Sequence, residues 1–461
     1  MKESLMKIPC KNNHYFQNWS QTYSCKPELY FEPRCTDDLR VILLEAKQLK
    51  KKVKVVGGGL SPSDIACTNH FMISMKLFNK ILEIDKTNCV ITVESGVTIY
   101  QLNNHVLPSN GLALSNMGSV SGQCVGGIIG TGTHGTGGNF GSFASCVLEV
   151  TFMISDGSII KCSKEKNGEL FQAVCCHLGL LGIILVVKIQ CEPAFKLHLK
   201  QASGLLEDNL VDLKSLISQS QHFRFFWFPH TDYVVNFMAD RTKRPLKEGG
   251  SWFWSQLVGH YVLEFFLWVS TFFPCLVPFI NRLFFKMCYS GSSESVRRSD
   301  RVFTFDCLFK QYVTEWAIPQ QNTVTVLRKM REWIIANSHV KVHFPVEVRF
   351  VKQDGIMLAP SGDEDVTYIG IISFRPYGKI VPHDEWWNFF ENLATEYGGK
   401  PHWAKAHKVK ADDFRRMYPK FDRFMEIRRQ LDPTCMFWND YWRRVMGKDG
   451  FHMVAPEKQR L

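Results

Sequence analysis

The first 195 residues alternate short apolar runs with helical periodicity, which is the pattern of a mixed α/β segment. Apolar residues recur at helical spacing from Leu39 to Leu49, and Thr36 or Asp37 can cap that helix. The run VLEVTFMISDGSIIK, residues 147–161, predicts a β-hairpin that turns at Asp156-Gly157. Further strands are predicted at residues 53–56, 72–75, 81–84, 90–93 and 183–189.

The middle of the chain has a different pattern. Residues 252–289 are dense in aromatic and aliphatic side chains, and only Glu264, Arg282 and Lys286 among them are charged. The segment is long enough to cross a bilayer core of about 30 Å as a helix. Glu264 and the prolines 274 and 278 interrupt such a helix, whereas the aromatic residues suit a membrane surface. Surface insertion is the expectation, and a single span or an ordinary protein core are the alternatives.

The rest of the chain mixes strands with helices, as an α+β domain does. Strands are predicted at 342–351 and 368–374, and helices at 323–336 and 385–397. At 461 residues the chain exceeds one ordinary core. The predicted organisation is a lead-in, a first domain, a second domain that contains the apolar segment, and a C-terminal part that returns to the first domain and ends in a polar, frayed tail. The ranges are 1–22, 23–195, 196–420 and 421–461.

Composition excludes several classes of protein. Hydrophobic residues make up 45% and charged residues 21%, so the chain folds. The net charge of +11 favours an anionic ligand, a phosphate-bearing cofactor or an anionic membrane surface, but no basic block suggests nucleic-acid binding. The fifteen cysteines lack metal-binding spacing, so we predict that most are buried thiols and that there is no metal site. The N-terminus lacks the apolar region of a secretory signal.

Two glycine-rich regions carry candidate cofactor chemistry. Residues 55–64 read VVGGGLSPSD, and residues 118–137 read GSVSGQCVGGIIGTGTHGTG. Glycines let the backbone approach a ligand and direct N–H groups onto phosphate oxygens. Neither region fits a GxGxxG or GxxxxGK[ST] motif. A set of turns is the alternative for one such cluster alone, but two in one α/β segment favour a cofactor with a pyrophosphate.

Two later motifs carry candidate catalytic groups. In PVEVRF, residues 345–350, strand alternation puts Glu347 and Arg349 on the same face. From this pattern alone an exposed surface ion pair remains the alternative. The motif HWAKAH, residues 402–407, contributes His402 and Lys405.

The glycine motifs, the Asp-Gly hairpin and HWAKAH together resemble the vanillyl-alcohol-oxidase superfamily of flavoproteins. Within it, the chain is similar over nearly its whole length to the animal aldonolactone oxidases, from FQNWSQTYSC (16–25) to LDPTCMF (431–437). FRFFWFPH, WAIP, PVEVRF and RPYGK add to the resemblance. It implies a two-domain α+β flavoprotein, with a PCMH-type FAD-binding domain at 23–195 and an α+β cap, or substrate, domain at 196–420.

The resemblance also implies roles for particular residues. Glu347 and Arg349 would bind substrate hydroxyls, Lys405 would lie near the reacting carbon, and His402 would pack close to the flavin ring. The main chain near Ile183 or Ile184 would touch the adenine side. The pyrophosphate would lie on Val56, Gly57, Gly58, Gly59, Leu60 and Ser61. The flavin would be lined by Gly118, Ser119, Cys124, Gly127, Thr131, Gly132, Thr133 and His134.

One position departs from the family pattern. The animal relatives have histidine at position 60, where it is joined to the flavin, but this chain has Leu60. We therefore predict non-covalent FAD, and a thioether through Cys124 is the rival hypothesis. Gly118 resembles the small residue of the oxidases, where the dehydrogenase relatives have alanine, so O₂ is the expected acceptor. The alternative is that Gly118 merely serves a turn.

The implied reaction is oxidation of L-gulono-1,4-lactone at C2 by O₂, which gives L-ascorbate through the 2-keto lactone, and hydrogen peroxide. A related galactono- or arabinono-lactone oxidase or dehydrogenase is the near alternative. A non-catalytic, membrane-bound flavin-binding relative is the alternative from another class. Because the animal relatives are microsomal, the resemblance implies the endoplasmic reticulum membrane.

Overall fold

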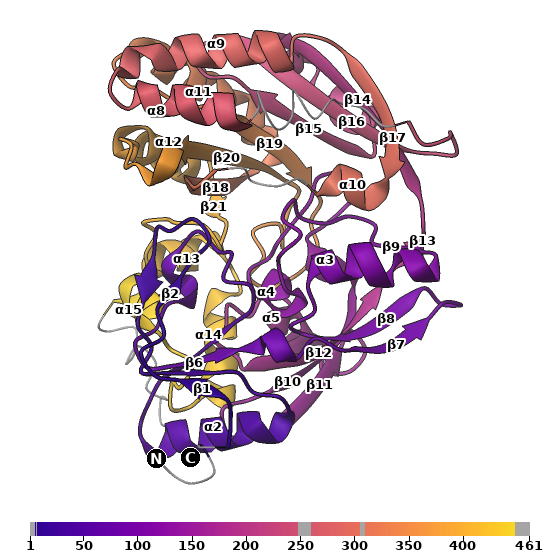
Figure 1. Ribbon diagram of the computed structural model, residues 1–461, viewed down its shortest axis with the longest axis vertical. Coiled ribbons are helices and arrows are strands. Elements are labelled where there is room, and N and C mark those ends of the chain that lie inside the picture. The colour runs from indigo at the N-terminus through magenta and orange to yellow at the C-terminus, as the bar shows by residue number, and fades with distance from the viewer. Residues whose placement is uncertain (1–4, 6, 248–259, 305–308, 448–461) are drawn as a thin grey trace, which may run out of the picture.

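The N-terminal half of the molecule contains two sheets. The computed structural model describes residues 5, 7–247, 260–304 and 309–447 (Figure 1). In the first sheet, β4 (Leu29–Phe31), β6 (Phe71–Ser74) and β5 (Val53–Val56) run parallel, and β1 (Cys10–Lys11) pairs antiparallel with β4. Helix α2 (Thr36–Gln48) buries Leu39, Ile42, Leu43 and Ala46 in the core that this sheet shares.

The second sheet of this half is antiparallel. Its order is β11 (Ile159–Ser163), β10 (Val147–Met153), β12 (Ile183–Gln190), β8 (Val90–Glu94) and β7 (Ile81–Asp85). Short helices α3 (Ile99–Gln101), α4 (Val125–Gly130) and α5 (Gly168–Val174) accompany it. Two small pairs, β2 (Phe16–Gln17) with β3 (Ser24–Cys25) and β9 (Leu112–Ala113) with β13 (Glu192–Pro193), complete the half.

An eight-stranded antiparallel sheet builds the other half (Figure 1). Its order is β17 (Ser293–Arg298), β14 (Lys196–Leu205), β16 (Tyr233–Thr242), β15 (His222–Trp227), β19 (Val346–Val351), β20 (Val366–Phe374), β18 (Gln311–Pro319) and β21 (Lys400–Pro401). The helices of this half are α6 (Leu206–Val211), α7 (Leu213–Gln219), α8 (Leu263–Ser270), α9 (Val277–Cys288), α10 (Ser299–Phe303), α11 (Thr323–Ala336) and α12 (Asp384–Glu396).

The C-terminal helices return to the first half. These are α13 (Ala411–Met417), α14 (Phe421–Leu431) and α15 (Asp440–Met446). The N–H of Val53 donates to the carbonyl of Met436 at 2.8 Å, which joins β5 to the segment between α14 and α15. The buried Asp432 carboxylate accepts from the N–H groups of Met436 and Phe437 and fixes that segment.

Local patterns predicted most of these elements. The strands at 53–56 and 183–189, the hairpin at Asp156-Gly157 and the helix at 323–336 are confirmed. Strand β19 begins at Val346 instead of residue 342, because Pro345 precedes it and has no N–H to donate. The residue that caps α2 is Cys35, without a side-chain hydrogen bond. Of the fourteen described cysteines, all free, six are buried, so the prediction of mostly buried thiols is only partly right.

The apolar middle segment is broken into short elements. Residues 252–259 lie outside the described part of the chain, as do residues 448–461 of the predicted frayed tail. The remainder forms α8, a 3₁₀ turn η7 (Pro274–Leu276) and α9. Among the described residues, no helix combines the length and apolar character that a bilayer crossing requires.

Candidate active site

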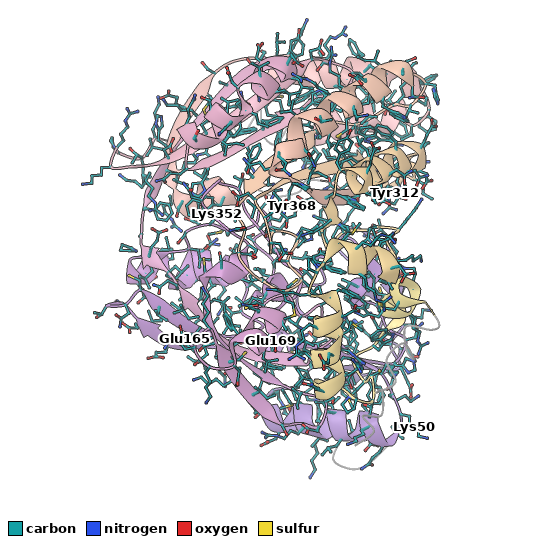
Figure 2. The ribbon with its side chains drawn as sticks, turned by 180° about the vertical axis from the view of Figure 1, so that it is seen from behind. Lys50, Glu165, Glu169, Tyr312, Lys352 and Tyr368 are labelled. Atoms are coloured by element: carbon teal, nitrogen blue, oxygen red, sulfur yellow. The ribbon has the colours of Figure 1, made fainter. Side chains whose placement is uncertain are left out.

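Strand register collects charged side chains on one face of the large sheet. Residues Phe226, Glu347, Gly370 and Glu315 form one row across β15, β19, β20 and β18. The next row is Arg224, Arg349, Tyr368 and Ala317. Val346, Val348 and Phe350 alternate with the charged residues of β19 and are buried in the core. Figure 2 shows Tyr368 where the two halves of the molecule meet, so this face looks toward the first half.

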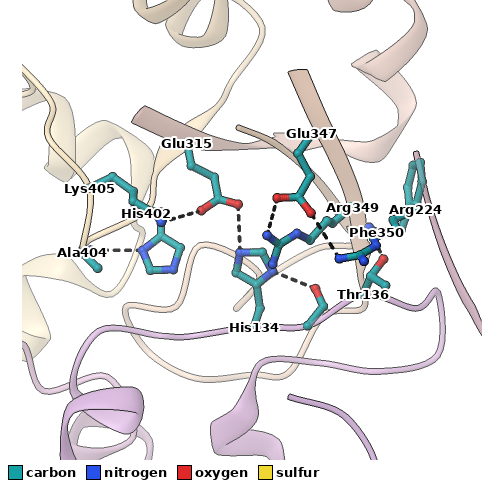
Figure 3. Close-up of polar contacts among 11 residues, drawn as sticks. His134, Thr136, Arg224, Glu315, Glu347, Arg349, Phe350, His402, Ala404 and Lys405 are labelled. Carbon is teal, nitrogen blue, oxygen red and sulfur yellow. Dashed lines mark hydrogen bonds and ion pairs between the residues drawn. The ribbon is translucent and has the colours of Figure 1, made fainter. Parts of the chain in front are cut away.

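Glu347 is held by two guanidinium groups. Arg349 lies on the same strand face and pairs with one carboxylate oxygen, and Arg224 Nη1 lies 3.4 Å from the other (Figure 3). Burial lowers the pKa of Arg224 to about 10, and its guanidinium carbon lies 5.1 Å from the Phe237 ring centroid. The alternative of an exposed surface ion pair is therefore excluded, because the pair lies in a partly buried cluster of charges.

A second carboxylate, Glu315, joins the two halves of the molecule. Its oxygens lie 3.6 Å from Lys405 Nζ and 3.5 Å from His134 Nε2, and His134 comes from the second glycine-rich region (Figure 3). Burial raises the pKa of Glu315, but Lys405, then His134 and Arg349, outweigh this and hold it well below its usual value. Glu315 is therefore an ionised carboxylate inside the protein.

His402 packs beside this cluster as a neutral ring. Its Nδ1 accepts the N–H of Ala404 at 3.1 Å, and burial lowers its pKa to about 3. The proton therefore resides on Nε2, and the ring can donate but not act as a base at neutral pH. The ring of His134 stacks on Tyr368 with centroids 3.5 Å apart.

The ligating atoms of His134, Glu315 and His402 lie within 4.8 Å of one another, close enough to hold a metal ion. Lys405 already supplies Glu315 with a cation at 3.6 Å. A metal ion there would place a second cation beside this ammonium, which is electrostatically unfavourable. We therefore interpret the cluster as an internally paired one.

A cavity of about 400 Å³ adjoins the charged rows. Arg224 and Arg349 line it from the large sheet, and Ser119 and Thr136 line it from the first half. His222, Phe237 and Phe303 close its other sides. This cavity can hold a small polar molecule against the guanidinium groups.

A larger cleft of about 890 Å³ lies within the first half, between the two glycine-rich regions. A Cβ on Gly58 would lie 2.8 Å from the carbonyl of Gly122, and one on Gly57 would lie 3.0 Å from the Cβ of Cys124. The close approach of the two loops therefore requires glycine at position 58 and leaves little room for a side chain at position 57. Predicted residues that line the cleft are Val56, Gly57, Gly58, Gly59, Leu60, Ser61, Cys124, Gly127, Thr131 and Ile184.

The polar groups of this cleft fit an anionic, hydrogen-bonding cofactor such as FAD. Lys54 is buried and lines the cleft, and its Nζ donates to the carbonyl of Leu178 at 3.3 Å. Burial lowers the pKa of Lys54 to about 8, so a phosphate would stabilise its charged form. The Ser95 hydroxyl lines the same cleft and is buried without a hydrogen-bond partner among the described residues. A ligand that accepts a hydrogen bond would satisfy it.

The other predicted cofactor residues lie elsewhere. Ser119 lines the smaller cavity, His134 contacts Glu315, and the Ile183 side chain is buried in the core beneath β12, on the side away from the cleft. Gly132 adopts φ +66° in the loop before His134. Gly118 packs against Thr133, since an added Cβ would lie 2.7 Å from Thr133 Cγ2.

Sequence reasoning missed three charged residues: Lys54, Arg224 and Glu315. Each is the single charged side chain of an apolar strand: Lys54 in VKVV, Arg224 in HFRFFW and Glu315 in QYVTEWAIP. A lone charge in a run that otherwise reads as buried was the available signal, because proteins rarely bury an unpaired charge.

Comparisons with known proteins agree with this architecture. The family model described as "FAD binding domain" matches residues 27–163, and the one described as "D-arabinono-1,4-lactone oxidase" matches residues 187–445. The chain is 50% identical to an L-gulonolactone oxidase of Scyliorhinus torazame, over 94% of this chain and 98% of that protein. It is 46% identical to the one of Bos taurus, over 93% and 98% of the two chains.

A solved structure supports the fold. Cholesterol oxidase from Brevibacterium sterolicum superimposes with a TM-score of 0.78, at 15% identity, over 96% of this chain and 98% of that one. The FAD-binding domain, the second domain and their arrangement define a two-domain flavoprotein oxidoreductase of the vanillyl-alcohol-oxidase type. More particularly, the chain belongs to the L-gulonolactone oxidase family.

Proposed function

We propose that this chain oxidises L-gulono-1,4-lactone at C2, which gives the 2-keto lactone and thence L-ascorbate. FAD, when bound, supplies the acceptor for the hydride from C2, and O₂ takes up the two electrons and two protons as hydrogen peroxide. One observation on the face of the large sheet carries the proposal. The Glu347–Arg349 pair and the Glu315–Lys405 pair lie on either side of Gly370, which has no side chain.

The charged groups have separate roles in this reaction. Glu347 accepts hydrogen bonds from the C2 hydroxyl and its neighbour. Arg349 and Lys405 stabilise the negative charge that develops on the C2 oxygen as its proton leaves to a local base or to water. His402 donates from Nε2 and stays neutral. Donors that ion pairs already hold in place are effective here because they need no reorganisation during the reaction.

Turnover of a lactone panel tests the substrate. We expect hydrogen peroxide release with L-gulono-1,4-lactone to exceed that with L-galactono- and D-arabinono-1,4-lactone. The D-arabinono-1,4-lactone oxidase model that matches residues 187–445 makes arabinonolactone the second candidate. A higher kcat/KM for arabinonolactone than for gulonolactone would overturn the substrate assignment but not the reaction class.

Non-covalent attachment of FAD belongs to the proposal. Leu60 lines the cleft and offers no nucleophile. Cys124 also lines it, but burial raises the pKa of its thiol to about 11, so the thiolate needed for a thioether is scarce at neutral pH. Acid precipitation should therefore leave a colourless pellet and a yellow supernatant. A yellow pellet that becomes colourless in Cys124→Ser would establish the thioether instead.

The choice of O₂ as acceptor rests on Gly118. In Gly118→Ala the new methyl would collide with Thr133 Cγ2, so a single variant mixes a packing effect with an effect on O₂. The double variant G118A/T133S removes that methyl group and restores the space. We expect a lower rate of reoxidation by O₂ in the double variant with unchanged reduction by lactone. Equal rates of reoxidation by O₂ in the wild type and in G118A/T133S would show that Gly118 serves only the turn.

The proposed location is the surface of the endoplasmic reticulum membrane. The apolar helices α8 and α9, together with the family resemblance, support it. Carbonate extraction of microsomes should release the chain, and a salt wash alone should not. Release by salt alone would contradict insertion, and retention after carbonate would contradict a surface location.

A further inference from the structure

Two half-buried cysteines lie in contact beside the larger cleft, which we call the cofactor cleft. Cys25 ends β3, and Cys67 follows the 3₁₀ turn η1 (Asp64–Ala66). The N–H of Thr68 donates to Cys25 Sγ at 3.3 Å, so Cys25 lies against the peptide group that follows Cys67. A hydrogen bond also joins the two thiols. Both side chains pack against one small core, formed by Phe16, Tyr30, Val56 and Met72.

The two thiols differ in how readily they ionise. The hydrogen bond from the Cys67 thiol and the N–H of Thr68 outweigh burial and lower the pKa of Cys25. The same thiol hydrogen bond, followed by burial, raises the pKa of Cys67 well above its usual value. A thiolate is the form of cysteine that attacks peroxide, and a neighbouring thiol then resolves the product. Cys25 is therefore suited to attack and Cys67 to resolve.

The hairpin that carries Cys25 supports the first glycine-rich loop. Phe16 of β2 pairs with Cys25 in the strand register. A Cβ on Gly59 would lie 3.2 Å from the Phe16 ring, and the N–H of Trp19 donates to the carbonyl of Gly59 at 3.1 Å. Gly59 lines the cofactor cleft. The β2–β3 hairpin therefore backs one wall of that cleft.

The segment that carries Cys67 forms another wall of the cofactor cleft. Ile65 and Ala66 of η1 line the cleft directly. The Asn439 Nδ2 group donates to the carbonyls of Ile65 and Cys67, at 2.9 Å in each case, and so fixes η1 to the C-terminal part of the chain. A covalent bond between Cys25 and Cys67 would therefore tie the two walls of the cleft together.

We infer that Cys25 and Cys67 are a peroxide-sensitive pair, which closes to a disulfide and locks these two walls around FAD. The inference rests on the proposed function, whose product is hydrogen peroxide.

The chemistry of the closure balances. The Cys25 thiolate attacks one oxygen of hydrogen peroxide, the O–O bond breaks, and a sulfenic acid and hydroxide form. The Cys67 sulfur then displaces the sulfenic hydroxyl group, which leaves as water with the proton of the Cys67 thiol. The first hydroxide takes up the proton that Cys25 had released. Two thiols and one peroxide thus give one disulfide and two waters, and the sulfurs lose the two electrons that the peroxide gains.

Buried cysteines elsewhere in the chain provide an internal reference. Cys175 and Cys176 are consecutive, but both are fully buried. Cys191 is also buried, and burial raises its pKa to about 12. Peroxide should therefore oxidise the half-buried Cys25–Cys67 pair while these thiols stay reduced.

Mass spectrometry of the full-length holoenzyme tests the closure. Hydrogen peroxide added without lactone should produce a disulfide between Cys25 and Cys67, which dithiothreitol reverses, and should leave Cys175 and Cys176 as thiols. Cys25→Ser and Cys67→Ser should each abolish this disulfide. Cys288→Ser removes another half-buried cysteine, on α9, and should leave the disulfide unchanged. The same disulfide should form during lactone turnover, and catalase should prevent it.

Two further measurements report on the cofactor cleft. Oxidised wild-type protein should release FAD about threefold to tenfold more slowly than reduced protein, because the cross-link restricts opening of the cleft. Recovery of flavin fluorescence after dilution follows this release. Amide hydrogen exchange in residues 57–66 should slow in parallel, and it does not depend on how the flavin is attached. Both differences should disappear in Cys25→Ser.

Two outcomes would overturn the inference. One is that Cys25 and Cys67 stay reduced in peroxide that oxidises the exposed Cys35 or Cys275. The other is a Cys25–Cys67 disulfide that changes neither FAD release nor hydrogen exchange in residues 57–66. Closure by added peroxide in a protein that releases no peroxide from any lactone would instead overturn the proposed function and support the thiol pair.

Discussion

Glu315 is a buried carboxylate that faces Lys405 at 3.6 Å and His134 at 3.5 Å. In the proposed reaction it is a positioning residue, because it orients the Lys405 ammonium group. The smaller cavity is lined by Arg224 and Arg349 from the neighbouring strands β15 and β19. At the scale of residues, the site depends on buried charges that hold one another in place.

Glu315→Gln should lower kcat by about 10- to 100-fold. This loss corresponds to the free energy of about one buried hydrogen bond to a charged group. KM should change little and FAD should stay bound, because Glu315 lies outside the cleft of the first half. Glu315→Asp should restore part of the rate. Glu391→Gln is the matched control, since Glu391 is also buried but lies on α12. A wild-type kcat in Glu315→Gln would refute the role.

Lys54→Met should weaken FAD binding roughly ten- to a hundredfold, which corresponds to about 1.5–3 kcal/mol for a charged hydrogen bond. Lys52→Met is the control, because Lys52 donates to the carbonyls of Thr434 and Cys435 outside the cleft. Fluorescence titration of the apoprotein with FAD measures both variants. Equal affinities in the two variants would exclude Lys54 from the cofactor site.

The same lysine predicts a pH dependence. Burial lowers the pKa of Lys54 from 10.5 to about 8, so the unfolded chain holds more protons between those values and the apoprotein gains stability as pH rises through that window. FAD binding should show the opposite trend and weaken above about pH 8, because the uncharged amine no longer attracts phosphate. In Lys54→Met this loss of affinity above pH 8 should disappear.

Strand β20 shows how an element shapes the site. Gly370 lies between Glu347 and Glu315 in the strand register, and an added Cβ would lie 3.7 Å from Glu315 Cγ, an ordinary contact. Gly370→Ala should therefore fold normally but intrude between the two carboxylates. We expect KM for the lactone to rise about tenfold with flavin content unchanged. Gly204→Ala, in β14 of the same sheet, is the control. An unchanged KM would show that substrate does not occupy this gap.

The elements that the sequence predicted are those that local pattern specifies. Alternation in PVEVRF placed Glu347 and Arg349 on one face, and helical spacing located α11. A lone charge in an apolar run marked Lys54, Arg224 and Glu315 as unusual, but their partners could not be predicted. Those partners come from other strands or loops, and register between distant segments leaves no local signal. The apolar segment was ambiguous for the same reason, since the turn at 376–380 that joins it is about a hundred residues away.

At the scale of the whole molecule, one loop of the first half joins the large sheet. The N–H of Gly137 donates to the carbonyl of Phe350 at 2.7 Å, and the Thr136 hydroxyl accepts from the N–H of Phe350 and donates to the carbonyl of Phe223. This loop also carries His134 to Glu315. In the proposed mechanism, the junction between the halves therefore helps to set the geometry of the site.

Thr136→Val removes the hydroxyl but keeps the shape of the side chain. The N–H of Phe350 and the carbonyl of Phe223 then lose this hydrogen-bond partner. We expect a loss of about 1–3 kcal/mol in the free energy of unfolding and a lower kcat. Urea denaturation and steady-state kinetics measure the two effects. Thr151→Val in β10 is the control. It should lower the free energy of unfolding and kcat much less than Thr136→Val does. Full stability in Thr136→Val would show that the halves are held by other contacts.

Anaerobic mixing of the yellow holoenzyme with L-gulono-1,4-lactone tests the central claim most directly. The visible flavin band should bleach in the wild-type protein, and it should persist in Glu347→Gln and Arg349→Met, which begin with the same spectrum. A wild-type band that no aldonolactone bleaches, or an Arg349→Met protein that bleaches at the wild-type rate, would contradict the account.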